Sequence, residues 1–144
     1  MTRDDIISAA RSEIGTPFRH QGRLSGKALD CAGLIIMVAK AIGAAYIDFT
    51  GYSRHPSDGL LESALDAQSC LDRVALADMQ AGDVLLMRFN SDPQHPAIFA
   101  GHSAIYQAEG IIPAWLQARK VCEHVLTDEW RSRIVRVYRF AGVA

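Results

Sequence analysis

The feature that most constrains the fold is the run CAGLIIMVAKAIG at residues 31–43, which is apolar on nearly every side. Leu34, Val38 and Ile42 recur at helical spacing, and Gly43 stands where many helices end in a left-handed residue. A helix that is apolar all round has to be covered on several sides. Because 144 residues is the length of one ordinary domain, this run predicts a central helix in a single domain spanning residues 1–144.

Caps and turn residues predict the other elements. Capping residues Thr2 and Ser57 favour helices over about Arg3 to Ile14 and about Asp58 to Gln68. Residues 15–29 and the proline-flanked stretch 92–99 have the composition of loops. Short apolar or β-branched runs predict strands, and a helical turn over Thr127 to Arg133 precedes the last of them; these runs are 84–89, 102–107, 110–115, 120–126 and 134–140. Helices followed by strands indicate an α+β fold, with N-terminal helices packed on a small antiparallel sheet.

Composition and charge exclude several functional classes. A net charge of -1 gives no overall electrostatic basis for binding nucleic acid, and no run of about 18 apolar residues could span a membrane. The N-terminal residues 1–15 are acidic near their start and lack the layout of a secretory signal, so we expect cytoplasmic synthesis. Three cysteines without a CxxC pair and five histidines without HExxH predict no metal site.

One cysteine has the position of a nucleophile. Cys31 falls in the first turn of the predicted central helix, where unpaired N–H groups and the helix dipole favour a thiolate. The preceding Asp30 would oppose ionisation if it faced the thiol, so we expect it to point elsewhere. His102 is the candidate base, because it opens a predicted strand, whereas His95 lies in a predicted loop. The alternative is structural: buried free cysteines are common in cores, and His102 could be a surface residue.

Three stretches in a fixed order resemble a known family. They are GTPFRHQGRLSGKALDCAGL, AGDVLLMRF and GHSAIY, and they extend from Gly15 to about Tyr106. This pattern is similar to that of the NlpC-type cell-wall cysteine peptidases, a papain-like group, and especially to their phage-tail-associated branch. The resemblance implies a papain-like NlpC-type fold, Cys31 as nucleophile and His102 as base. It also implies that the family cuts peptide bonds in cell-wall peptides, often beside γ-linked D-glutamate, without a cofactor.

The resemblance assigns further residues to the site. Asp30 maps to a position that can hold the free amine of the substrate's L-alanine, and Phe18 replaces a family tyrosine among the substrate-binding residues. Ala32 replaces a common serine. A third polar residue that orients the histidine falls on Pro113, which has no side-chain acceptor. Three residues are candidates to replace it or to line the cleft: His20, Gln117 and His124.

Two functional hypotheses follow. The first is a cysteine peptidase that hydrolyses an amide bond in peptidoglycan stem peptides, with Cys31 as thiolate and His102 as base. The second is a catalytically weakened cell-wall-binding or phage tail-assembly module of the same fold, in which Phe18, Ala32 and Pro113 mark the loss of activity. Phage tail proteins are the further partners that the resemblance implies, with action at the cell wall.

Overall fold

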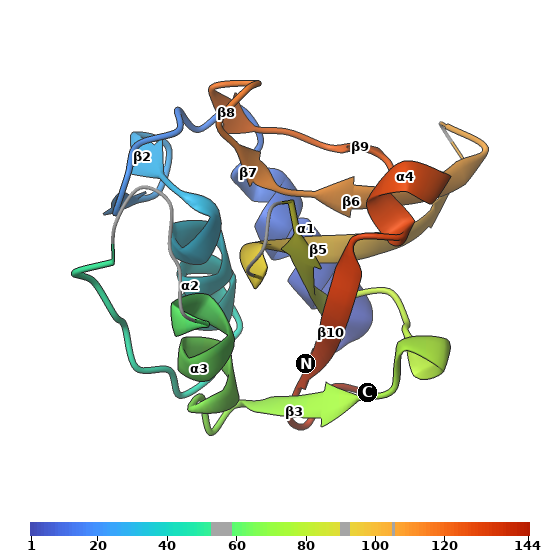
Figure 1. The fold of residues 1–144 in the computed structure, drawn as a ribbon, viewed down its shortest axis with the longest axis horizontal. Coiled ribbons are helices and arrows are strands. Elements are labelled where there is room, and N and C mark those ends of the chain that lie inside the picture. The colour runs from blue at the N-terminus through green and yellow to red at the C-terminus, as the bar shows by residue number, and fades with distance from the viewer. Residues whose placement is uncertain (53–58, 90–92, 105) are drawn as a thin grey trace.

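A computed structural model describes residues 1–52, 59–89, 93–104 and 106–144. It confirms the α+β class (Figure 1). The elements, in chain order, are α1 (Arg3–Ser12), β1 (Arg23–Leu24), β2 (Ala28–Leu29), α2 (Cys31–Ala41), α3 (Leu60–Asp66), β3 (Leu71–Val74), a short 3₁₀ helix (Leu76–Asp78), β4 (Val84–Arg88), β5 (Pro93–Ser103), β6 (Ala108–Ile112), β7 (Ala114–Trp115), β8 (Lys120–Val121), β9 (His124–Val125), α4 (Asp128–Arg131) and β10 (Ile134–Phe140).

The described residues form one main antiparallel sheet with the strand order β3-β10-β4-β5-β6-β9. In β4 and β5, Val84 lies opposite Ile98 and Leu86 lies opposite Pro96. The pairing of β6 with β5 begins where Ile112 lies opposite Ile98. Two small hairpins, β1-β2 and β7-β8, lie outside this sheet. The chain ends meet, because the Ala144 N–H donates to the Met1 carbonyl oxygen at 3.1 Å.

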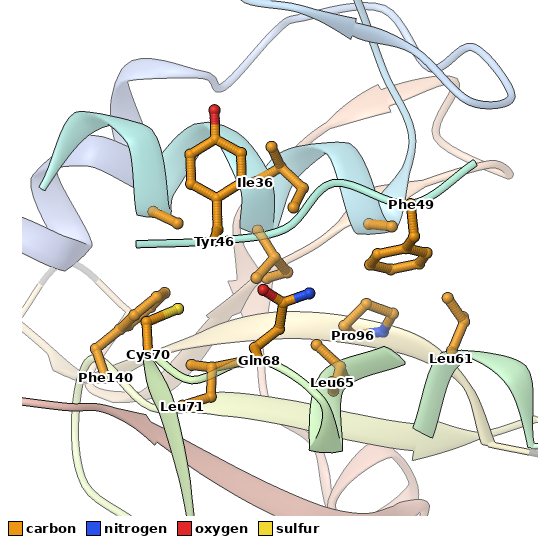
Figure 2. A pocket seen from close by; sticks show the side chains of 13 residues that line it. Ile36, Tyr46, Phe49, Leu61, Leu65, Gln68, Cys70, Leu71, Pro96 and Phe140 are labelled. Atoms are coloured by element: carbon orange, nitrogen blue, oxygen red, sulfur yellow. The ribbon is translucent and has the colours of Figure 1, made fainter. Parts of the chain in front are cut away.

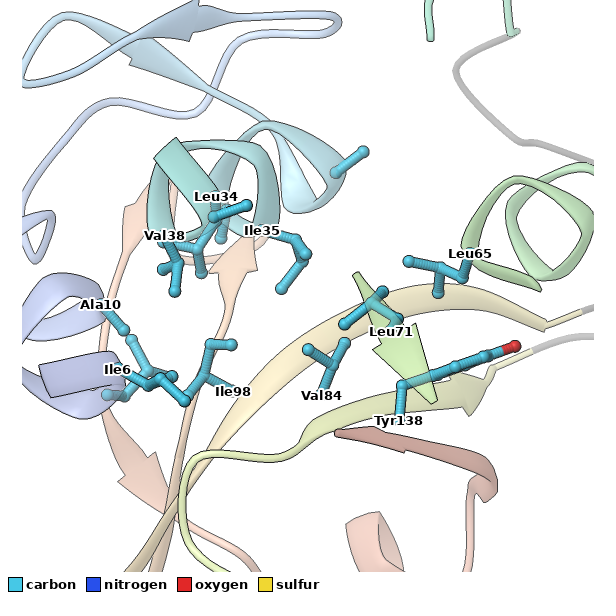
Figure 3. Packing of buried hydrophobic residues seen from close by; sticks show 14 of the residues in the cluster. Ile6, Ala10, Leu34, Ile35, Val38, Leu65, Leu71, Val84, Ile98 and Tyr138 are labelled. Carbon is cyan, nitrogen blue, oxygen red and sulfur yellow. The ribbon is translucent and has the colours of Figure 1, made fainter. Parts of the chain in front are cut away.

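The sheet buries both of its faces. Alternate strand residues such as Val84 and Ile98 pack with α1, α2 and α3 in one cluster, as Figure 3 shows for Ile6, Leu34 and neighbouring side chains. The residues between them on the strands form a second cluster that Trp130 of α4 covers. Because successive strand side chains point to opposite faces, the helical half of the chain covers one face and the C-terminal part covers the other. This arrangement makes α2 central, as predicted.

The helix predictions are largely confirmed. Thr2 caps α1 in a capping box with Asp5, although the helix ends at Ser12, two residues before the predicted end. Gly43 follows α2 with a φ of 74°, the left-handed stop that the sequence predicts. The third helix begins at Leu60 and ends at Asp66. Its predicted first residue, Asp58, and the predicted cap, Ser57, lie outside the described residues.

The predicted loop at 92–99 is wrong, because the structure has the strand β5 there. Proline disfavours central strands, since it lacks the N–H that a ladder needs. Pro96 is tolerated because it pairs only with β4 at this point, while β6 joins the strand from Ile98 onward. The strand predicted at 102–107 is confirmed only for its first two residues: β5 ends at Ser103, residue 105 lies outside the described residues, and Gln107 has a positive φ of 55° before β6 begins.

Within the described residues, no helix combines the length and apolar character needed to cross a membrane.

Candidate active site

Cys31 is the first residue of α2, and its neighbours place it beside the start of β5. Ala32 and Pro96 line one apolar cavity between α2, the 44–52 segment and α3. Figure 2 shows Pro96 facing this cavity across from Phe49. The cavity has room for about one water molecule, at about 10 Å³. The cavity is therefore too small for a ligand, but its walls show that the first turn of α2 lies against the N-terminal end of β5.

Asp30 caps this helix from a buried position. Its Oδ1 accepts hydrogen bonds from the Gly33 N–H at 2.8 Å and from the Arg23 guanidinium at 2.9 Å. Its Oδ2 accepts one from the Gln21 N–H at 2.8 Å and one from the Tyr52 hydroxyl. The residue is only 2% exposed. The expectation that Asp30 faces the substrate and holds its amine therefore needs correction, because donors of the chain itself occupy both carboxylate oxygens.

Gly33 is required by the same loop. A Cβ at this position would lie 2.2 Å from the Gly22 carbonyl oxygen and 3.2 Å from Asp30 Oδ1. Only glycine allows the 21–23 segment to approach the helix so closely. The short contact explains why the Asp-Cys-Ala-Gly sequence is needed where α2 begins.

The environment of Cys31 favours a neutral thiol. Burial raises the pKa of the half-buried Cys31 thiol to about 12, and the neighbouring Asp30 carboxylate acts in the same direction. Backbone N–H groups of Ala32 and Cys31 lower the pKa, as a helix N-terminus should, but they are outweighed. This direction of the pKa shift opposes the resting thiolate that the sequence predicts. The Asp30 carboxylate that caps α2 therefore also opposes ionisation of the Cys31 thiol.

Alkylation by iodoacetamide tests this directly. Because burial raises the pKa of Cys31, only a small fraction of the molecules carries the thiolate near pH 8. We expect the alkylation rate at Cys31 to rise about tenfold per pH unit between about pH 7 and pH 9.5 without levelling off. Peptide mapping separates Cys31 from Cys122, whose pKa is also raised by burial and which serves as the internal comparison. An alkylation rate that levels off below about pH 8 at Cys31, but not at Cys122, would contradict the raised pKa of the Cys31 thiol.

The structure does not bring His102 to Cys31. His102 is exposed and lies opposite Glu109 next to the β5–β6 turn. The adjacent Gly101 lies against Ala81, whose carbonyl oxygen accepts a hydrogen bond from Arg3 of α1. This end of β5 is thus beside the start of α1. His102 follows Pro96 by six residues, and a bulge with Gly101 at a φ of 71° interrupts the strand between them.

His95 is the histidine at the α2 end of β5. It directly precedes Pro96, just as Cys31 directly precedes Ala32, and it is 6% exposed. Its ring lies among three aromatic side chains, with centroid distances of 5.6 Å, 4.8 Å and 6.1 Å to Phe89, Trp115 and Trp130, respectively. In the part of the chain that the structure describes, its Nε2 is buried without a hydrogen-bond partner.

Sequence reasoning selected the exposed one of two similar segments. The pattern His-x-Ala-Ile-aromatic occurs twice, as HPAIF at residues 95–99 and as HSAIY at residues 102–106. The flanking prolines made the first copy look like a loop. A usable signal was the longer alternation in HPAIFA, where His95 and Phe99 take one face and Ile98 takes the other.

His124 is the only one of the three third-group candidates with a contact to this aromatic cluster among the described residues. Its ring lies 4.5 Å from that of Trp130, and its Nδ1 is 2.9 Å from the Val125 carbonyl oxygen. Burial, together with a smaller contribution from the neighbouring His124, lowers the pKa of His95 to about 3. His95 is therefore neutral through the physiological range.

The other predicted residues lie in three places. Phe18 and His20 lie near the start of α2, and the His20 ring is 5.5 Å from that of Tyr52 in an edge-on arrangement. Gln117 is exposed in the turn between β7 and β8. Pro113 is buried between β6 and β7, where its carbonyl oxygen accepts from the Cys122 N–H at 3.0 Å.

The described residues contain no group of three or more His, Cys, Asp or Glu side chains that could hold a metal ion.

A cysteine at the start of a central helix, against an antiparallel sheet that bears a buried histidine, defines a papain-like architecture. The model of the NlpC/P60 family matches residues 15–139. The chain belongs to the NlpC/P60 family of papain-like cell-wall hydrolases.

Solved structures share this fold. An NlpC/P60 family protein from Bacillus cereus has a TM-score of 0.69 at 19% identity, covering 97% of this chain and 40% of its own. The peptidoglycan hydrolase RipB from Mycobacterium tuberculosis has a TM-score of 0.64 at 16% identity, and the match covers 95% of this chain and 63% of RipB. Ly7917, solved with the hydrolyzing product of MDP, has a TM-score of 0.65 at 14% identity, and the match covers 99% of this chain and 64% of Ly7917. The chain thus spans less than two thirds of each of these three proteins. No curated protein sequence matches it.

Proposed function

We propose that this protein is a cysteine peptidase that hydrolyses an amide bond in peptidoglycan stem peptides, with Cys31 as the nucleophile. The observation that carries the proposal is the position of Cys31 at the first turn of α2, beside the His95 end of β5, in a chain of the NlpC/P60 family. RipB, which has the same fold, is a peptidoglycan hydrolase. Family membership and the site's position both support this chemistry.

His95 replaces His102 as the proposed base. His102 is exposed at the far end of the strand, whereas His95 directly precedes Pro96, which lines the same cavity as Ala32. The His95 ring itself packs on the other face of the strand, with Phe89, Trp115 and Trp130. Its neutral imidazole has a lone pair that can accept a proton. The base is thus assigned to the histidine on the strand end that faces α2.

The chemistry begins from two neutral groups. As the Cys31 sulfur attacks the amide carbonyl carbon, its proton passes to His95, and the Cys31 backbone N–H stabilises the developing oxyanion. The imidazolium then gives this proton to the leaving amine as the C–N bond breaks. A water molecule, deprotonated by His95, releases the acyl group as a carboxylic acid and restores the thiol. The scheme needs no metal or organic cofactor.

A second candidate function is a wall-binding or tail-assembly module that keeps the fold without its activity. Three observations favour it: the raised pKa of Cys31, the lowered pKa of His95 and the absence of a side-chain acceptor at Pro113. Each of these opposes the thiolate–imidazolium pair that would make the nucleophile strong.

Product analysis distinguishes the two functions. The protein is incubated with muramyl peptides of defined sequence, and mass spectrometry follows the release of a new amine terminus. A cysteine peptidase gives products whose formation stops after complete alkylation of Cys31. Saturable binding of the intact peptides with no product over many hours would reject hydrolysis and support the binding module.

The phage-tail-associated branch, with tail proteins as partners, is a further proposal that rests on the sequence pattern from Gly15 to Tyr106. Cytoplasmic synthesis followed by action at the cell wall belongs to the same proposal. Detection of the chain in purified phage particles would support it, and its presence only in envelope fractions of phage-free cells would oppose it.

A further inference from the structure

A groove of about 610 Å³ lies next to the candidate site, and we call it the arginine groove. Its lining residues are Pro17, Phe18, Arg19, His20, Leu116 and Arg119. Backbone contacts fix its two walls, because the Phe18 N–H donates to the Arg119 carbonyl oxygen at 2.9 Å and Pro17 forms an isolated bridge with Lys120. The groove therefore has a defined shape even though its side chains reach solvent.

The groove carries positive charge without a carboxylate to balance it. In the described part of the chain, eight arginines form ion pairs with Asp or Glu side chains. Arg19, Arg88 and Arg119 form none, and two of these three line the groove. No Asp or Glu is among the lining residues. The chain thus pairs most of its arginines internally and leaves two together here.

The groove is joined to the first turn of α2. The Arg19 N–H donates to the carbonyl oxygen of Leu29 at 3.1 Å, and Leu29 lies two residues before Cys31. On the same wall, the His20 ring meets the Tyr52 ring, and the Tyr52 hydroxyl donates to Asp30. A ligand in the groove would therefore lie beside the helix start that carries the thiol.

We propose that the arginine groove binds a carboxylate-bearing part of a peptide. Guanidinium groups pair with carboxylates through two parallel N–H donors, and two of them side by side suit a peptide with more than one free carboxylate. Phe18 and Leu116 offer apolar surface for the carbon chain between those groups. The identification of this peptide as a peptidoglycan stem peptide rests on the proposed function; the preference for carboxylates does not.

The test measures binding without turnover. Titration calorimetry uses the Cys31→Ala protein, with and without Arg19→Gln and Arg119→Gln, and a synthetic stem peptide with free or fully amidated carboxylates. We expect the double variant to bind the free peptide about tenfold more weakly, equivalent to about 1.4 kcal/mol. The affinity for the amidated peptide should differ by less than about twofold between the protein with both arginines and the double variant. Raising the salt concentration should weaken binding of the free peptide to the Cys31→Ala protein more than to the arginine-substituted protein.

Lys40→Gln is the matched control, because it removes one positive charge from the exposed far end of α2. It should leave both affinities unchanged. Peptides amidated only at the C-terminus or only at side chains show which carboxylate the groove selects. Equal weakening for free and amidated peptides, or no weakening of either, overturns the proposal.

Failure of this proposal is separable from failure of the hydrolase. Selective binding of the free peptide without any product from the protein that retains Cys31 leaves the groove valid and rejects hydrolysis. Cleavage with an unchanged KM after both arginine substitutions leaves the hydrolase valid and rejects the groove.

Discussion

Replacing Cys31 or His95 by alanine is expected to lower kcat for stem-peptide hydrolysis about 10⁴-fold, whereas His102→Ala should change it less than about twofold. Loss of the sulfur removes the nucleophile, and loss of the imidazole removes the group that takes and returns its proton. His102 is exposed beside Glu109 at the other end of β5, so its removal should not affect either step. The measurement is the initial rate of amine release from a defined muramyl peptide.

His102→Ala and His95→Ala are matched changes on one strand, but only the second opens space in a packed cluster. Thermal unfolding of each variant therefore accompanies the kinetics, and His95→Gln, which fills more of that space, separates loss of the base from loss of the fold. A folded His95→Gln protein with unchanged kcat, together with an inactive His102→Ala protein, would restore the original assignment of the base.

The local rules of helix formation were sufficient for much of this fold. Thr2 with Asp5, the apolar run ending at Gly43, and Thr127 before α4 each specify an element through neighbours within a few residues. Such signals survive in an isolated sequence because capping groups and periodic side chains act over one or two turns. The α+β class follows from them.

His95, the base proposed here, was not selected from the sequence because its strand is specified by partners that are distant in sequence. Pro96 violates the local preference of a strand, and only the pairing with Leu86 of β4 and the late start of β6 make it acceptable. The aromatic surroundings of His95 come from Phe89, Trp115 and Trp130, which are also separated along the chain. Sequence periodicity does not report contacts of this kind.

The direction of the thiol's pKa shift also depends on contacts that the sequence does not report. A helix start favours the anion, and this contribution was predicted and is present. Burial depends on how many neighbours the fold gathers around Cys31, and it outweighs the helix start. Asp30 was expected to point away, yet its charge also raises the pKa of the thiol, because it caps the same helix.

The absence of a polar side chain at Pro113 corresponds to a missing hydrogen bond at the His95 ring in the part of the chain that the structure describes. A polar side chain there would be expected to bond the imidazole, and the Nε2 of His95 is buried without a partner among the described residues. The ring is instead held by aromatic contacts, closest to Trp115 at 4.8 Å. Orientation of the base by packing in place of a hydrogen bond is consistent with a slow enzyme and with an inactive binder.

Asp30→Asn is expected to destabilise the protein by about 3 kcal/mol, because it leaves the partly buried Arg23 guanidinium without its buried charge partner. It also places an amide donor among the N–H of Gln21, the N–H of Gly33 and the Tyr52 hydroxyl. Burial and the bond to Asp30 raise the pKa of Tyr52, so its hydroxyl stays protonated as a donor. Urea unfolding followed by circular dichroism measures the loss.

The matched control for this loss is Asp48→Asn, since Asp48 is the other carboxylate on Arg23, at 2.9 Å, but is exposed. It should cost less than about 1 kcal/mol. Asp30→Asn should also speed alkylation of Cys31 at a fixed pH, because the carboxylate that raises the pKa of the thiol is gone. If the Asp30→Asn protein unfolds at the same urea concentration as the wild type and Cys31 is alkylated at the same rate, the prediction is contradicted. This carboxylate would then neither hold the 21–23 segment on α2 nor suppress the thiolate. The neutral thiol would then have burial as its only cause.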